Sequence, residues 1–294
     1  ADVVVTVTLE NDAPVLNFNQ QALHYSENDV ATQIDGGAFL SDPDGVYEWS
    51  GGTLIVQLTG NAEASDEISF GTYGSGYVHL FEGVLYWGAT KIGTLSQTSG
   101  VVTGGAALEI TIAEGTPTTQ VQHIIRSILY RTTSEDPGIG DRTVTITATD
   151  SSGASVADTR TVKVENINDA PEIANVTNGA RNYYEHGSSN QNNDAIAVNN
   201  AGATLTDADW TGGSLSFKIS DNAENPDQLS LNTTTLGTLH IDGTDLLDGA
   251  NVIGTVSASG GIVTGDTALT VTLTQAATIQ QVQTALRAVQ FRST

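Results

Sequence analysis

The sequence predicts an all-β protein built from tandem β-sandwich modules, each with one short crossover helix. Three observations lead to this prediction: short stretches in which β-branched and polar residues alternate, turn-forming residues between these stretches, and a repeat that runs through the chain. Alternation with a period of two is typical of strands with one buried face. Motifs that recur in a fixed order indicate that one structural unit occurs more than once.

Internal repetition organises the chain. Six motifs recur in the same order, at offsets from 157 residues (Asn11 to Asn168) to 165 residues (Leu40 to Leu205). Loops of slightly different length between otherwise equivalent elements account for this spread. We therefore expect three parts, namely the last strand of a preceding module (1–10), module one (11–167) and module two (168–294), which lacks its last strands.

Each module has the same series of predicted elements. The alternating stretches, which predict strands, are Thr53–Leu58, Leu108–Ile112, Thr143–Thr149 and Thr161–Val164 in module one and Leu215–Ile219 and Leu269–Leu273 in module two. One segment in each module instead carries apolar residues at helical spacing. These residues are Val121, Ile124, Ile125, Ile128 and Leu129, repeated as Val282, Ala285, Leu286 and Val289. The spacing predicts a short helix that crosses between sheets and packs on the core.

Composition excludes several function classes. The 294 residues include 34 Asp and Glu but only 10 Lys and Arg, which gives a formal charge of −24. Nucleic acids and anionic membrane surfaces bind basic faces, so neither is an expected partner. No apolar run approaches the roughly 18 residues of a membrane helix, so membrane insertion is not expected. Without cysteine and without nucleophile-elbow, phosphate-loop or dinucleotide motifs, we do not expect an enzyme.

Oxygen-bearing side chains gather in the sequence near the predicted module boundaries. We assign Asn11, Asp12, Glu27, Asp42 and Asp44 to the first boundary, and Asp150, Asn166, Asn168, Asp169, Glu185, Asp207 and Asp209 to the second. Calcium takes six to eight oxygens from carboxylates, amides and carbonyls, and so many carboxylates together repel one another unless a cation is bound. The pattern predicts Ca²⁺ sites at the boundaries. The alternative is that Asn-Asp-x-Pro and Asp-x-Asp-Gly are turn chemistry alone.

A second acidic cluster lies within each module. It consists of Asn61, Glu63 and Asp66 in module one and Asn222, Glu224 and Asp227 in module two. We expect it to be a solvated loop rather than a further cation site.

The boundary motifs resemble those of a known family. Val162–Glu165 followed by Asn166-Ile167-Asn168-Asp169-Ala170-Pro171 is similar to the cadherin linker, and Tyr25-Ser26-Glu27-Asn28 is similar to the Glu-Asn of the first cadherin strand. The longer modules with a helix are more similar to cadherin-like repeats of giant bacterial surface proteins and to chondroitin-sulfate-proteoglycan-type repeats. This resemblance implies Ig/cadherin-like sandwiches, calcium that stiffens a rod of modules, and a secreted or cell-surface location in an adhesin or extracellular matrix protein.

The expected partners follow from the same reasoning. Neighbouring modules of the chain are the first, and a second copy is another, because residues 1–10 could complete an open sheet by head-to-tail strand exchange. An alternative function is carbohydrate or protein binding by the aromatic residues of module one. These are Trp49, Trp87, Tyr47, Tyr73, Tyr77 and Tyr86, of which those between 73 and 87 have no aromatic counterpart in module two.

Overall fold

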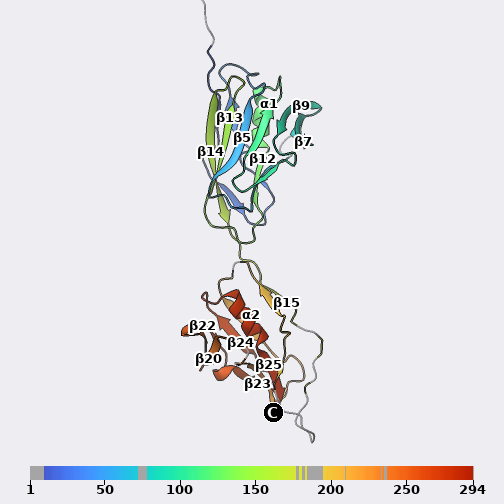
Figure 1. Cartoon of the computed structure of the whole chain (residues 1–294), viewed down its shortest axis with the longest axis vertical. Coiled ribbons are helices and arrows are strands. Elements are labelled where there is room, and N and C mark those ends of the chain that lie inside the picture. The colour runs from blue at the N-terminus through green and yellow to red at the C-terminus, as the bar shows by residue number, and fades with distance from the viewer. Residues whose placement is uncertain are drawn as a thin grey trace, which may run out of the picture. The chain divides into compact units, whose positions relative to one another are not determined.

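The computed structural model of the chain describes residues 10–71, 78–176, 179–180, 183, 195–208, 210–232, 234 and 237–293. The chain forms two compact units, unit 1 (Ala1–Ile167) and unit 2 (Asn168–Thr294). Both consist mainly of β-strands in several sheets (Figure 1). Among the residues that the structure describes, each unit has one α-helix. The prediction of an all-β fold is confirmed.

The described strands of unit 1 form three groups. The largest is an eight-stranded sheet in the order β2 (Leu23–Ser26), β14 (Ser155–Glu165), β13 (Arg142–Thr149), β5 (Thr53–Gly60), β11 (Leu108–Ile112), β9 (Thr90–Leu95), β8 (Val84–Trp87) and β7 (Val78–Phe81). The second has the order β10 (Val101–Thr103), β6 (Asp66–Phe70), β12 (Ile128–Thr132) and β3 (Thr32–Gln33). The third is the pair of β1 (Val15–Asn17) and β4 (Phe39–Ser41). Neighbours are antiparallel except β2 and β14, which are parallel.

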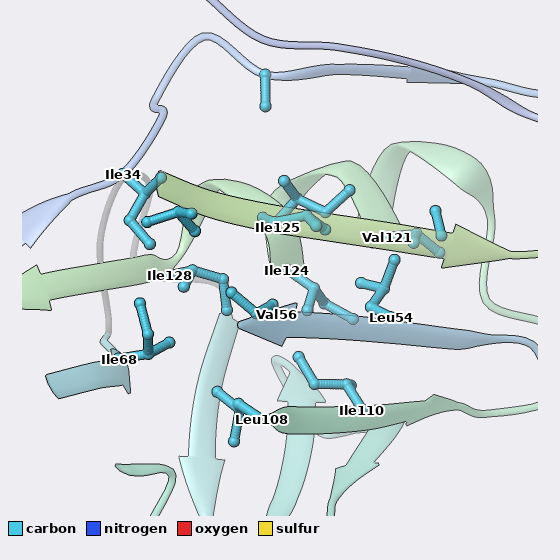
Figure 2. Close-up of a cluster of buried hydrophobic side chains, with 14 of the residues drawn as sticks. Ile34, Leu54, Val56, Ile68, Leu108, Ile110, Val121, Ile124, Ile125 and Ile128 are labelled. Carbon is cyan, nitrogen blue, oxygen red and sulfur yellow. The ribbon is translucent and has the colours of Figure 1, made fainter. Parts of the chain in front are cut away.

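The core of unit 1 lies between its helix and the sheets. Helix α1 (Thr118–Arg126) connects β11 of the large sheet to β12 of the four-stranded sheet. Val121, Ile124 and Ile125 fall on one side of it and are at most 1% exposed. Figure 2 shows these side chains facing those of β5 and β11, among them Leu54 and Ile110. The helical spacing in the sequence therefore predicted both the helix and its buried face.

Unit 2 repeats most of this arrangement. Its described five-stranded sheet has the order β18 (Gly213–Phe217), β24 (Leu269–Leu273), β22 (Asn251–Val256), β21 (Asp245–Asp248) and β20 (Leu239–Asp242). A four-stranded sheet has the order β16 (Ile196–Ala197), β25 (Val289–Ser293), β19 (Asp227–Leu231) and β23 (Ile262–Thr264). The third group is the pair of β15 (Glu172–Ala174) and β17 (Thr204–Thr206). A 3₁₀ turn, η1 (Ser259–Gly261), precedes β23. Helix α2 (Ile279–Arg287) connects β24 to β25 and begins at a capping box of Thr278 and Gln281. In the described residues no helix has the length and apolarity needed to cross a membrane.

The two large sheets differ at one edge. In unit 1, β5 pairs with β11 on one side and with β13 on the other. The equivalent strand of unit 2, β18, has only β24 as a neighbour among the described residues. The β13–β14 hairpin thus covers an edge in unit 1 that the described part of unit 2 leaves open.

The second acidic cluster is not a solvated loop in unit 1. Asp66 and Arg142 are both 0% exposed, and Arg142 Nε lies 2.9 Å from Asp66 Oδ2. Glu63 Oε2 lies 3.0 Å from Arg142 Nη2, and Tyr130 donates its hydroxyl to Asp66 Oδ1 over 2.7 Å. Our expectation was wrong for unit 1, because Arg142 is 76 residues from Asp66 in the sequence and no local pattern indicated the pair. In unit 2, Asn222 and Glu224 are exposed, as expected.

Candidate metal centre

Five oxygen-bearing side chains meet at one end of unit 1. Strand β1 runs antiparallel to β4, with Val15 opposite Ser41, so the residues before β1 lie beside those after β4. The turn between β13 and β14 also lies at this end of the unit. We call this group the acidic tip, and it consists of Asn11, Asp12, Asp42, Asp44 and Asp150.

Hydrogen bonds tie the acidic tip together. Asn11 Nδ2 donates to Asp150 Oδ2 over 2.9 Å, and the backbone N–H of Asp12 donates to Asp44 Oδ2 over 2.6 Å. The backbone N–H of Asp44 donates to Asp42 Oδ1 over 3.0 Å, which is the contact of an Asx turn. The tip therefore joins three segments of the chain: the one that leads into β1, the one that follows β4, and the hairpin turn.

Burial and neighbouring negative charges act in the same direction on Asp42. Burial raises the pKa of the Asp42 carboxyl, and the negative charges of Asp150, Asp44 and Asp12 raise it further, against one backbone hydrogen bond that lowers it. Asp42 Oδ2 is buried and has no hydrogen-bond partner among the described residues. A buried carboxylate oxygen without a donor, beside three other carboxylates, is unfavourable unless a cation is bound.

Asp150 has the opposite balance. Burial raises the pKa of its carboxyl, but hydrogen bonds from Asn11 and from three backbone N–H groups outweigh burial, so that the pKa lies below its ordinary value. The three N–H groups belong to Ser152, Gly153 and Ala154, at 2.8, 2.7 and 3.0 Å from Asp150 Oδ1. Asp150 is thus a stable carboxylate that anchors the tip.

The structure corrects the boundary to which two predicted ligands belong. We assigned Asp150 to the second boundary, but it bonds to Asn11 at the first. We assigned Glu27 to the first boundary, but the parallel pairing of β2 with β14 places it beside Glu165, whose carbonyl accepts the Glu27 N–H over 2.9 Å. Both errors arise because β14, 11 residues long, separates the two ends of the unit.

The opposite end of unit 1 has its own polar group. Glu27 is 1% exposed there, at the end of β2. Asn166 Nδ2 donates to Asp136 Oδ1 over 2.7 Å, and Asn28 Nδ2 lies 3.3 Å from Glu135 Oε2. No motif in the sequence indicated Glu135 and Asp136, which lie in the loop between β12 and β13.

Unit 2 contains the remaining predicted ligands. Asp169 precedes β15 and Asp207 follows β17, and the pairing of Glu172 with Thr206 brings these two positions to one end of the unit. Asn168 Nδ2 donates to the carbonyl of Asp169 over 2.8 Å. Glu185 and Asp209 lie outside the described residues.

The donor set of the acidic tip suits calcium, although its geometry is not that of a formed site. Within the described ranges, no three His, Cys, Asp or Glu side chains lie together as a group that could hold a metal ion. Several of the oxygens accept N–H groups, as the turn alternative predicts. Ca²⁺ binding would therefore require Asp12 and Asp44, which are exposed, to rotate toward Asp42.

The aromatic residues of the alternative function have structural contacts. Trp49 is 0% exposed and donates to Thr118 Oγ1 over 3.0 Å, so it belongs to the core. The ring of Trp87 lies 5.1 Å from that of His123 on α1, and His79 stacks on Tyr86 at 5.4 Å. Tyr73 and Tyr77 lie outside the described residues.

No protein-family model matches the chain, and a search of curated proteins finds no match either.

Proposed function

We propose that the chain is a calcium-stabilised structural segment of a large secreted surface adhesin or extracellular matrix protein, built from tandem Ig/cadherin-like sandwich modules. The observation that carries this proposal is Asp42 Oδ2, a buried carboxylate oxygen without a hydrogen-bond partner in the described structure, surrounded by Asp12, Asp44 and Asp150. A divalent cation would neutralise this group. It would also hold Asn11 and Asp12, which lie in the segment that leads into β1, against the turn between β13 and β14.

The mechanism is thermodynamic linkage. A cation that binds only the folded tip stabilises unit 1, by about 2.7 kcal/mol when its free concentration is a hundred times the dissociation constant. In a secreted protein, calcium is present at concentrations that suit weak sites with dissociation constants of about 0.1–1 mM. The role we propose is that of an extender, in which the cation stiffens the chain and takes no part in a reaction.

Other features of the chain support this role. The repeated units and the charge of −24 fit a cation-collecting chain of tandem modules. Carbohydrate binding by the aromatic residues has less support, because Trp49 and Trp87 are engaged with the core and α1.

Thermal unfolding in chelator and in millimolar calcium tests the proposal. We expect calcium to raise the Tm of unit 1, and Asp42→Asn to remove this increase. The control is Glu114→Gln, which changes an exposed carboxylate outside the tip and should leave the increase unchanged. Identical melting curves in chelator and calcium would refute the proposal.

A further inference from the structure

A cavity opens on the side of unit 1, next to β14. It has a volume of about 370 Å³, and its lining includes Asn19, Val30, Gln33, Asp35 and Arg160. Strand β2 pairs with β14 over Val162–Glu165, which leaves Arg160 outside this pairing. The residues that line the cavity all lie in the described part of unit 1, and none of them belongs to the acidic tip.

A buried ion pair lines the cavity. Arg160 Nη1 lies 3.1 Å from Asp35 Oδ2, and the two side chains are 11% and 3% exposed. The backbone N–H of Asn19 donates to Asp35 Oδ2 over 2.6 Å, and that of Gly37 donates to Asp35 Oδ1 over 2.8 Å. Arg160 Nη1 also donates to the carbonyl of Ile34. These contacts fix the positions of the carboxylate and the guanidinium.

The ion pair retains hydrogen-bonding capacity for a ligand. Arg160 Nε is buried, and no group among the described residues accepts from it. The contacts of Arg160 with Ile34 and Asp35 both use Nη1, although a guanidinium has five N–H donors. Asp35 Oδ1 accepts the Gly37 N–H and can accept a second donor. A donor and an acceptor therefore lie side by side at the cavity.

The rest of the lining favours a neutral ligand. The charges of Asp35 and Arg160 are opposite, and all other lining residues are uncharged, so the cavity offers no net charge to an anion or a cation. Val30 is 84% exposed and presents an apolar surface. Gly36 and Gly37 have no side chain, which allows a ligand to approach the backbone closely.

We propose that this cavity binds one ring of a neutral saccharide. A hydroxyl group both donates and accepts, so that one ring hydroxyl would donate to Asp35 Oδ1 while its neighbour accepts from Arg160. The C–H groups of the ring would contact Val30. The volume of the cavity falls within the range of small-molecule sites. Binding requires no cation and is independent of the function proposed for the acidic tip.

A two-dimensional NMR titration of the intact chain in chelator tests this proposal. The probes are glucose, galactose, mannose, fucose and N-acetylglucosamine. We expect at least one of them to shift the amide signals of Asn19, Gly36 and Gly37 saturably, with a dissociation constant of about 1–10 mM. The uronic acid and the amino sugar that correspond to this probe should bind more weakly, because each carries a charge that the cavity does not neutralise.

Replacement of the arginine tests the hydrogen bonds. Arg160→Lys keeps a positive charge opposite Asp35 but removes the planar set of donors, so it should weaken binding at least about fivefold. The control is Arg131→Lys, at a half-exposed side chain that does not line the cavity, which should change the affinity less than about twofold. Melting curves of both variants show whether the fold is retained.

A second variant leaves the ion pair in place. A Cβ at Gly36 would lie 2.7 Å from Gln33 Oε1, so Gly36→Val narrows the cavity and should also weaken binding at least about fivefold. Gly105→Val is the matched control, because neither glycine has a positive φ and a Cβ at Gly105 makes only ordinary contacts. It should leave the affinity unchanged.

Several outcomes would overturn the proposal. One is that no probe gives saturable shifts, or that the shifts lie away from Asn19, Gly36 and Gly37. Another is binding that both Arg160→Lys and Gly36→Val leave unchanged. Tighter binding of the uronic acid or the amino sugar than of the neutral probe would assign the cavity to a charged ligand instead.

Discussion

Arg142 Nε lies 2.9 Å from Asp66 Oδ2, and neither residue has any exposed surface. This ion pair joins the first residue of β13 to the first residue of β6, and so links the two main sheets of unit 1. The Arg142 guanidinium also donates through Nη1 to the carbonyls of Gly138 and Gly140. A buried charge that is paired and hydrogen-bonded in this way is costly to disrupt from either side.

Replacement of Arg142 by methionine should destabilise unit 1 by about 3–5 kcal/mol, because it leaves Asp66 buried without its counter-charge. Chemical unfolding followed by hydrogen exchange at β13 measures this loss. The control is Arg131→Met, which breaks the 2.6 Å contact with Glu67 at a half-exposed side chain and should cost less than about 1 kcal/mol. Equal costs for the two variants would show that Arg142 has no special role.

The hydroxyl of Tyr130 is a separate contribution. Tyr130→Phe should lower the free energy of unfolding by about 1–2 kcal/mol, because Asp66 Oδ1 loses a buried donor. Tyr47→Phe, at a side chain that is 61% exposed, is the matched control and should be neutral. Urea unfolding of both variants checks the difference, and a neutral Tyr130→Phe would contradict the role of the hydroxyl.

The raised pKa of Asp42 predicts a pH dependence in the absence of calcium. A carboxyl whose folded-state pKa is raised destabilises the fold when it ionises, so its contribution worsens as pH rises from the ordinary aspartate pKa through the raised value. In chelator, Asp42→Asn should therefore be more stable than wild type at pH 7, with the difference vanishing near pH 3. Unfolding curves across this range measure it, and a difference that grows toward low pH would contradict the assignment.

The sequence predicted the elements whose signal is local. The spacing of Val121, Ile124 and Ile125 predicted α1, and alternation predicted β5, β11 and β13 nearly to their ends. The tip was also predicted in part, because Asp12 and Asp42 flank strands that pair with each other. In each case a short pattern contained the necessary information.

Residues brought together by long-range pairing could not be placed from the sequence. Glu27 and Asp150 each lie at the end of unit 1 opposite to the one that we expected. The reason is that β2 pairs with β14, 139 residues further along the chain, and that the 11 residues of β14 separate the two ends. Arg142 follows a glycine-rich loop that resembles any other turn, so its burial against Asp66 had no local signal. A charged side chain is buried only where other groups pair with its charge, and the charged partner of Arg142 is distant in the sequence.

Calorimetric titration of calcium into the wild-type chain and into Asp42→Asn tests the central claim most directly. We predict saturable binding to wild type with a dissociation constant of about 0.1–1 mM, and binding to Asp42→Asn that is weaker by at least about tenfold, because a carboxylate ligand and its charge are lost. Equal titrations for the two proteins, or no binding heat with wild type in millimolar calcium, would contradict a cation site at the acidic tip.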